Sequence, residues 1–298
     1  MPLILVPTPV GNLEDITLRA IRVLKEADLV ACEDTRRTLR LLNHLGIRVP
    51  LVSSHEHNEK EKAPFLLRAL LEGKKVALVS DAGTPGISDP GAHLVGEAIR
   101  EGIPVEVLPG ATALIPALVL SGLPTHTFHF AGFLPPRRGD RQKRLHLLRE
   151  IRCTLVFYVS PHRLQGEVSD CALVLGNRPA ALVRELSKVH EEVLRMGLDQ
   201  LAERVLSPMK GEMVLVVGGA TEDPKSVGED GEGSWEAYAR QVLRKGLSIR
   251  DVVKTVHERY GISKNCAKDF LIKTVSEDED SISQIDDEQA KRRQREDE

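Results

Sequence analysis

The sequence predicts an α/β fold with two domains. Short apolar runs, such as residues 3–6 and 76–79, alternate with longer amphipathic segments, which is the pattern of strands separated by helices. These runs are apolar throughout, as in a parallel sheet that helices cover on both faces. A chain of 298 residues is also long enough to form two hydrophobic cores.

The first domain is predicted to span residues 1–120. Its strands are the apolar segments at residues 3–6, 28–32, 51–52, 76–79 and 105–108. Its helices are predicted at residues 18–24, 38–45, 62–71 and 92–100, with a last one that runs to about residue 120. Three helices are followed by a glycine, Gly46, Gly73 or Gly102, which readily adopts the left-handed conformation that ends a helix.

The second domain is predicted to span residues 125–220, after a hinge at residues 121–125. Its strands are the apolar segments at residues 128–133, 155–158, 180–183 and 213–217. A polar linker at residues 221–233 precedes a short helical segment at residues 234–275. The tail at residues 276–298 has ten acidic and four basic residues and almost no apolar ones, so we expect it to be disordered.

The composition indicates a cytoplasmic protein without a membrane segment. No apolar run approaches the roughly 18 residues of a membrane-spanning helix, and the N-terminus lacks the basic flank of a signal peptide. The four cysteines form no C-x-x-C pair, so we expect reduced thiols and neither a disulfide nor a zinc site. The net charge is −3, but outside the acidic tail the chain has 37 basic and 34 acidic residues. This excess weakly favours an anionic partner.

The most informative motif is the loop at residues 80–91, Ser-Asp-Ala-Gly-Thr-Pro-Gly-Ile-Ser-Asp-Pro-Gly, which directly follows a predicted strand. Its glycines and prolines favour a stiff turn whose backbone approaches a ligand closely. It lacks the lysine of a phosphate-binding loop, and the chain has no G-x-G-x-x-G at its first helix. Asp81 would repel phosphates but suits a ribose hydroxyl or a cationic ligand. The loop therefore predicts a nucleoside ligand, the alternative being an ordinary connecting turn.

Several motifs occur together in one order and spacing. They are residues 7–13, 33–36, 55–59, 80–91 and 109–113. Together they resemble the ribosomal RNA small subunit methyltransferase I family of the tetrapyrrole-methylase-like superfamily, over about residues 3–220. The resemblance implies a mainly parallel first sheet, a smaller mixed second sheet and a cofactor cleft between the domains. It also implies 2′-O-methylation of a cytidine in small-subunit (16S) ribosomal RNA with S-adenosyl-L-methionine, by a homodimer.

The resemblance further implies cofactor-binding residues in both domains. They are Val10, Asp81, Gly83, Thr84, Thr112 and Ala113 in the first domain, and Tyr158, Val183 and Glu212 in the second. Asp81 is the most specific of them, although a carboxylate in such a loop can also serve only to cap the loop itself.

A ribose hydroxyl is a weak acid, so its methylation needs a general base or a group that stabilises the developing alkoxide. Glu33 and Asp34 follow a predicted strand, which places them at the same sheet edge as the cofactor loop. Asp34 has the alternative of capping the next helix. Glu185 and Lys188 are the candidates in the second domain, and the sequence does not choose among the four.

Clustered basic residues are candidates for phosphate contacts. The RNA-binding candidates are Arg36, Arg37, Arg137, Arg138, His162 and Arg163. His55 and His57 are too few ligands for a metal site, so no metal is predicted. The chain departs from the family pattern at Val159 and at residues 189–190, on the substrate side. Two other functions stay open, namely methylation of a tetrapyrrole or another small molecule, and RNA binding without catalysis.

Overall fold

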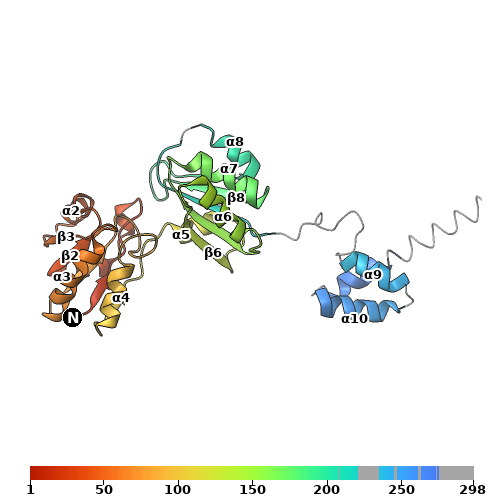
Figure 1. Ribbon diagram of the computed structural model, residues 1–298, viewed down its shortest axis with the longest axis horizontal. Helices are drawn as coiled ribbons and strands as arrows, with labels where there is room; N and C mark the ends of the chain where they lie inside the picture. Colours follow the sequence, from red (N-terminus) through yellow and green to blue (C-terminus); the bar gives the residue numbers. More distant parts are fainter. Residues whose placement is uncertain (208, 221–234, 245–246, 261–262, 273, 275–298) are drawn as a thin grey trace, which may run out of the picture. The chain divides into compact units, whose positions relative to one another are not determined.

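The computed structural model describes residues 1–207, 209–220, 235–244, 247–260, 263–272 and 274 (Figure 1). The chain divides into two compact units, residues 1–220 and 221–298. The predicted acidic tail and polar linker lie outside the described residues. Within the described part of the chain, no helix has the length and apolar character needed to cross a membrane.

The first sheet of residues 1–220 has five parallel strands in the order β3-β2-β4-β1-β5. The strands are β1 Leu3–Leu5, β2 Leu29–Cys32, β3 Leu51–Ser53, β4 Val76–Val79 and β5 Val105–Val107. The helices between them are α1 Leu18–Glu26, α2 Thr35–His44, α3 Glu59–Leu71 and α4 Ala92–Arg100. Because the strands are parallel, the loops that follow them meet at one edge of the sheet.

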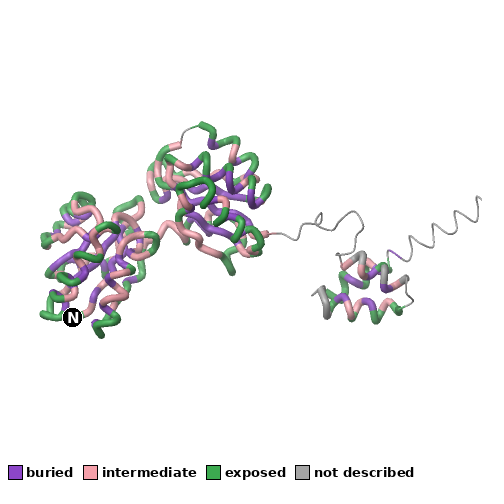
Figure 2. Tube along the Cα trace, in the orientation of Figure 1, coloured by how far each residue is buried: buried purple, intermediate pink, exposed green. Residues whose placement is uncertain are grey.

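Helices cover both faces of this sheet, as the continuously apolar strands predict. Along β4, Val76 and Leu78 pack in one core with α3 and α4, whereas Ala77 and Val79 pack in a second core with α1 and α2. Successive side chains of a strand point to opposite faces, so a strand of four buried residues needs a core on each side. The buried segments in Figure 2 follow the strands accordingly.

The second sheet is mixed, with the order β6-β7-β10-β8-β9. Only β6 and β7 are parallel neighbours, and the other pairs are antiparallel. Its elements are β6 Phe128–Phe133, α6 Arg138–Leu148, β7 Thr154–Val159, α7 Leu164–Leu175, β8 Pro179–Arg184, β9 Glu192–Gly197, α8 Leu198–Arg204 and β10 Met213–Val217. The predicted α/β fold with a parallel and a mixed sheet is therefore confirmed. The sequence did not predict β9, because this partly exposed strand has no continuous apolar run.

The helix α5 Leu114–Ser121 connects the two sheets. It follows β5 of the first sheet in the sequence, yet its Ala117 and Leu118 pack against Val156, Val183 and Val216 of the second. Helices α6, α7 and α8 cover the opposite face of that sheet. The turn that opens α5 therefore lies between the loops of the first sheet and one face of the second.

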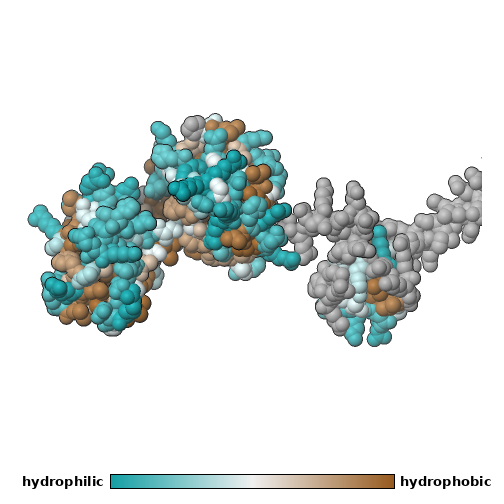
Figure 3. Space-filling model, viewed as in Figure 1, coloured by the Kyte–Doolittle hydropathy of each residue, from teal (hydrophilic) through white to brown (hydrophobic). Residues whose placement is uncertain are grey.

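The second unit is a small group of helices that contains α9 Trp235–Arg244, α10 Ile249–Tyr260 and the helical residues 264–272. Its core includes Ala239, Val252 and Leu271, and the rings of Trp235 and Phe270 meet edge to face at 5.0 Å. In Figure 3, hydrophilic residues cover much of the visible face of residues 1–220, and apolar residues appear between them in separate patches.

Candidate active site

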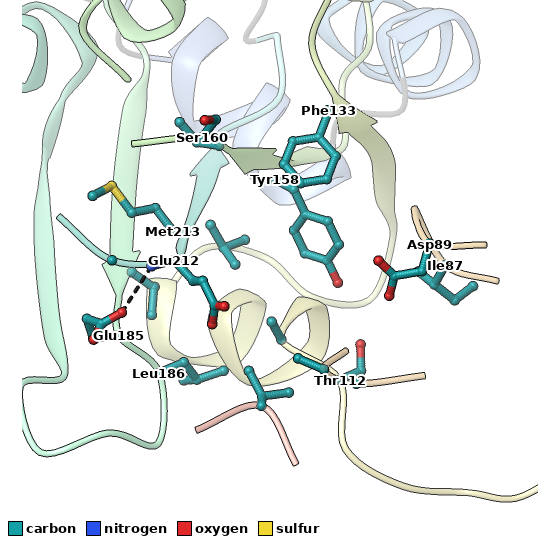
Figure 4. Close-up of a pocket in the computed structure, with 18 of the residues that line it drawn as sticks. Ile87, Asp89, Thr112, Phe133, Tyr158, Ser160, Glu185, Leu186, Glu212 and Met213 are labelled. Carbon is teal, nitrogen blue, oxygen red and sulfur yellow. Dashed lines mark hydrogen bonds between the residues drawn. The ribbon is translucent and has the colours of Figure 1, made fainter. Parts of the chain in front are cut away.

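A cavity of about 480 Å³ lies where the loops of the first sheet meet strands β7, β8 and β10 of the second (Figure 4). Pockets for small-molecule ligands typically measure ~300–1,000 Å³. Of the nine cofactor-binding residues predicted above, eight line this cavity. They are Val10, Gly83, Thr84, Thr112, Ala113, Tyr158, Val183 and Glu212.

Backbone hydrogen bonds hold the first-sheet side of the cavity together. Thr8 and Gly83 exchange a pair of backbone N–H···O bonds of 2.9 Å each, and the hydroxyl of Thr84 donates to the carbonyl of Ala111 at 3.0 Å. Gly83 has φ +82°, a conformation that residues with a side chain rarely adopt, and a Cβ at this position would contact Ala111 and Val10. The loops after β1, β4 and β5 therefore form one fixed wall made largely of backbone.

Aromatic residues of the second sheet form part of the opposite wall. The Tyr158 ring lies 5.0 Å from Phe130 and 5.5 Å from Phe133, measured between ring centroids. Burial raises the pKa of its phenol, an effect that Thr112 of the other wall partly offsets. Phe133 lines the cavity and is 49% exposed, so an aromatic face is available at the surface beside it.

Acidic residues outnumber basic ones in the cavity. Asp89, Glu185 and Glu212 line it, and Lys188 is the one Lys or Arg among the described lining residues. Such a surplus of negative charge disfavours phosphates and favours a cationic ligand. The loop sequence predicted a carboxylate that disfavours phosphates and suits a cationic ligand. The charges of the cavity agree with this prediction, although the loop carboxylate that lines the cavity is Asp89 and not Asp81.

Lys188 binds two of these carboxylates. Its ammonium lies 3.0 Å from Glu185 and 3.2 Å from Glu212. Burial lowers the pKa of Lys188, but the hydrogen bonds to both carboxylates outweigh it and the net shift is upward. The hydrogen bond from Lys188 is the main cause that lowers the pKa of Glu185, whose carboxylate also accepts the backbone N–H of Glu212 at 3.0 Å. At neutral pH Lys188 is therefore charged and cannot act as a base.

Asp81 lies outside the 480 Å³ cavity, unlike the eight other predicted cofactor residues. Its carboxylate accepts the backbone N–H of Asp34 at 3.0 Å and pairs with Arg37 at 3.3 Å. It lines a smaller cavity of about 200 Å³ beside α2. These contacts match the alternative stated above, in which the carboxylate stabilises the loops.

Glu33 and Asp34 also lie outside the larger cavity. Asp34 caps α2 by accepting the backbone N–H of Arg36 at 2.8 Å, and its hydrogen bonds with Arg36 hold its pKa far below the usual value. Burial, and next the charge of Asp81, raise the pKa of Glu33. Of the four predicted catalytic candidates, only Glu185 and Lys188 line the cavity.

Most of the predicted RNA-binding arginines have acidic partners within the protein. Arg36 pairs with Asp34, and Arg37 with Asp81. Arg138 lies 3.2 Å from Asp170 on α7, and Arg163 lies 3.3 Å from the buried Glu167. Arg137 and His162 are exposed.

Asp89 is a lining residue that the sequence analysis did not identify. In Figure 4 its carboxylate points into the cavity, toward the hydroxyl end of Tyr158. Burial raises the pKa of Asp89 to about 6, and the negative charges of Glu33, Asp81 and Glu212 add to this effect. The available signal was a second aspartate in the motif at residues 80–91, but only the backbone path decides which of the two faces the cavity.

Known proteins resemble this chain over most of its length. Residues 2–202 match the family model of the Tetrapyrrole (Corrin/Porphyrin) Methylases. A ribosomal RNA small subunit methyltransferase I from Halalkalibacterium halodurans is 46% identical over 268 residues, which cover 88% of this chain and 91% of the relative. The protein of the same name from Thermotoga maritima is 45% identical over 219 residues, 73% of this chain and 98% of the relative.

A solved structure has the same fold. The uroporphyrin-III C-methyltransferase from Thermus thermophilus, complexed with S-adenosylhomocysteine, is 26% identical with a TM-score of 0.53, covering 73% of this chain and 97% of its own. Three findings agree with one another. The fold has two helix-covered sheets with a cavity between them, the family model matches residues 2–202, and the relatives are nearly half identical. The chain therefore belongs to the tetrapyrrole methylase family and, within it, to the ribosomal RNA small subunit methyltransferase I family.

Proposed function

We propose that this protein transfers a methyl group from S-adenosylmethionine to the ribose 2′-hydroxyl of a cytidine in 16S ribosomal RNA of the small subunit. The observation that carries the proposal is the acidic cavity, formed by backbone-rich loops on one side and aromatic residues on the other. The names of the relatives support the substrate, and the ligand of the solved neighbour supports the cofactor.

The residues of the cavity fit S-adenosylmethionine. The small side chain at Ala113 and the φ of +82° at Gly83 leave room for a nucleoside against the backbone. Val10 and Val183 provide apolar surface for an adenine ring. The surplus of carboxylates suits a ligand with a positive sulfur. When bound, S-adenosylmethionine supplies an electrophilic methyl group on that sulfur.

The protein's own residues would align the acceptor and exclude water, which is the main contribution an enzyme makes to an in-line displacement. The hydrogen-bonded loops of the first sheet and the packing of α5 on the second sheet fix the two sides of the cavity relative to each other. Phe133 presents an aromatic face on which an unstacked base can lie. The exposed Arg137 and His162 follow β6 and β7 and would contact phosphates near that face.

The proposal also includes a cytoplasmic location, where small ribosomal subunits are found, and a homodimer. Both extend the family resemblance to this chain. Sedimentation equilibrium of the purified protein tests the second point, since a homodimer has twice the mass of the 32.9 kDa chain.

Transfer of a labelled methyl group tests the function directly. Purified protein with tritiated S-adenosylmethionine is expected to label small ribosomal subunits, and mass spectrometry of the digested RNA should find 2′-O-methylcytidine. Tetrapyrrole acceptors serve as the comparison and should stay unlabelled. Label in a tetrapyrrole would instead support the small-molecule alternative. RNA binding without any calorimetric signal for S-adenosylmethionine would support a non-catalytic role.

A further inference from the structure

A second cavity, of about 200 Å³, lies beside α2 and apart from the acidic cavity described above. The loops after β1 and β4 and one face of α2 line it. A cavity needs only about 10–15 Å³ to hold one water molecule, so this small cavity has room for a much larger group.

The small cavity and the acidic cavity share one wall. In the loop after β1, Pro9 lines the small cavity and the next residue, Val10, lines the acidic one. In the loop after β4, Asp81 lines the small cavity and Ala82 lines the acidic one. The paired backbone hydrogen bonds described above join these two loops. A strand of RNA whose target ribose reaches the acidic cavity therefore passes close to the small one.

The two cavities have opposite charge. The small cavity has two cationic groups, Arg37 and Arg40, and Asp81 is its one acidic group among the described lining residues. In the acidic cavity the carboxylates outnumber the single lysine. A phosphate is therefore disfavoured in the acidic cavity and favoured in the small one.

Asp81 holds Arg37 in place. Its carboxylate lies 3.3 Å from the guanidinium of Arg37 and also accepts the backbone N–H of Asp34 at 3.0 Å. The side chain of Arg37 is 57% exposed, whereas that of Asp81 is 20% exposed. A guanidinium has five N–H donors in one plane, so Arg37 can keep this ion pair and donate to a second anion. The ion pair thus orients Arg37 without using all of its donors.

Arg40 is the cation of the small cavity that has no partner in the protein. It follows Arg37 by three residues on α2, which places both on the same face of the helix. No ion pair or hydrogen bond joins the exposed side chain of Arg40 to another residue in the part of the chain that the structure describes. At the base of the cavity, the buried hydroxyl of Thr8 already donates to the carbonyl of Ser80 at 3.1 Å. The free binding capacity of the cavity is therefore cationic.

We propose that the small cavity is a subsite for a phosphate group of the substrate RNA, with Arg37 and Arg40 as the residues that bind it. The proposal rests on the methyltransferase function above. Each ribose of an RNA strand has a phosphate on either side, and the acidic cavity is unsuited to both. Arginine forms strong, paired hydrogen bonds with phosphate oxygens. A phosphate held in the small cavity would fix the position of the strand relative to the shared wall without reading its sequence.

Arg40→Gln tests the subsite, because it removes the charge from an exposed side chain. The KM for small ribosomal subunits should rise at least about tenfold, as expected for loss of a hydrogen bond to a charged group. The kcat should stay within about twofold, since the lost contact contributes equally before and during the reaction. The calorimetric Kd for S-adenosylmethionine should also stay within about twofold, because Arg40 lies outside the acidic cavity.

The salt dependence of binding identifies the contact as one with a phosphate. Each phosphate contact to a single strand adds about 0.7 to the slope of log Kd against log salt concentration. Filter binding of small ribosomal subunits should show this slope lowered by about 0.7 in Arg40→Gln. Arg40→Lys keeps the charge and should keep the slope. Arg22→Gln, on the exposed face of α1 and outside both cavities, is the matched control and should behave as wild type.

A second variant blocks the small cavity and leaves both arginines in place. Leu13 lines the cavity and is 43% exposed, so Leu13→Glu adds a carboxylate there without disturbing a core. It should raise the KM for small subunits as Arg40→Gln does. Leu18→Glu, at a position that is 86% exposed on α1, makes the same change of charge outside both cavities and should leave KM unchanged.

The outcomes separate this inference from the proposed function. If the wild type neither binds nor labels small subunits, the proposed function fails and the inference with it. If the wild type labels them and Arg40→Gln has the KM and salt slope of Arg22→Gln, the inference alone is wrong. Equal losses in both variants would indicate attraction by overall charge and would also overturn the subsite. A raised Kd for S-adenosylmethionine in Arg40→Gln would instead make the small cavity part of the cofactor site.

Discussion

Asp89 and Glu33 interact electrostatically, although only Asp89 lines the cavity. The negative charge of Glu33 is one cause of the raised pKa of Asp89, after burial. The substitution Glu33→Gln removes that charge, so protonation of Asp89 becomes less favourable and its pKa falls. We expect the Asp89 carboxyl group to titrate at lower pH than in the wild type, where its pKa is raised to about 6. Infrared difference spectra of the cofactor-free protein, recorded against pH, measure this shift, and the band of Asp89 is identified by its absence in Asp89→Asn.

Glu150→Gln is the control for this prediction, because the Glu150 side chain is 90% exposed and outside the cavity. Its profile should match that of the wild type. A titration of Asp89 that moves to higher pH in Glu33→Gln would contradict the electrostatic argument, since loss of a negative neighbour cannot raise the pKa of a carboxyl group.

Asp81 provides a second prediction for a single residue. Its carboxylate accepts the N–H of Asp34 and pairs with Arg37, so Asp81→Ala leaves a backbone donor without its acceptor. We expect the free energy of unfolding to fall by about 1–3 kcal/mol. The affinity for S-adenosylmethionine should change little, because Asp81 lies outside the cavity.

Urea unfolding and calorimetry on the same samples measure the two effects of Asp81→Ala. An affinity loss of more than about tenfold in a variant of unchanged stability would favour the role predicted from the sequence, in which Asp81 contacts the cofactor. In that case the ion pair with Arg37 would have to open on binding.

At the level of single residues, eight of the nine predicted cofactor residues line the cavity, whereas Asp81 lies outside it and Asp89 of the same loop lines it. Asp81 and Asp89 occur in one loop, and composition does not distinguish them. The left-handed turn at Ser88 directs Asp89 inward, whereas Asp81 points toward α2. The ion pair of Arg138 with Asp170 could not be predicted from the sequence either, because it depends on how α6 packs on α7. These are tertiary properties that a local pattern does not contain.

At the level of elements, the strands of the first sheet could be predicted because both of their faces are buried. Four consecutive buried residues in β2 and in β4 appear in the sequence as continuous apolar runs. The edge strand β9 has five of its six residues only partly buried, so its apolar residues are mixed with charged ones. The contact of α5 with the second sheet was not predictable either, since an apolar helix packs equally well on any apolar face.

The segment from Glu185 to Lys188 provides a prediction for a loop. Glu185 and Ser187 have φ values of +53° and +60°, and Gly211, with φ +100°, lies directly against Glu185. A Cβ at position 211 would overlap the Glu185 carboxylate, so Gly211→Ala must displace this side chain from its contacts with Lys188 and with the N–H of Glu212. We expect the Kd for S-adenosylmethionine to rise at least about tenfold, because Glu185 and Lys188 line the cavity.

Gly176→Ala is the matched control for Gly211→Ala. Gly176 has φ +82° at the end of α7, but a Cβ there would meet nothing within 4 Å. This variant should lose about 1–3 kcal/mol of stability through backbone strain and keep its affinity. Calorimetry and thermal unfolding of both variants separate the effect of strain from that of the displaced carboxylate. Equal affinities in the two would mean that the loop does not shape the site.

For the molecule as a whole, the described residues that line the cavity come from both sheets of residues 1–220. Loops of the first sheet form one wall, and strands of the mixed sheet form the other. The second unit has a core of its own, centred on Val252 and Val256. No described residue beyond 220 lines the cavity. The binding of S-adenosylmethionine should therefore be a property of residues 1–220.

A chain that ends at Ala220 tests this division. It keeps both sheets and their four apolar clusters, so we expect it to fold and to bind S-adenosylmethionine with a Kd within about twofold of the full chain. The relative from Thermotoga maritima supports this expectation, since 98% of its length aligns with only 73% of this chain. Calorimetry on both chains measures the affinity. A shortened chain that folds but binds weakly would show that the second unit contributes to the site, whereas normal binding with slower labelling of small subunits would assign the second unit to RNA recognition.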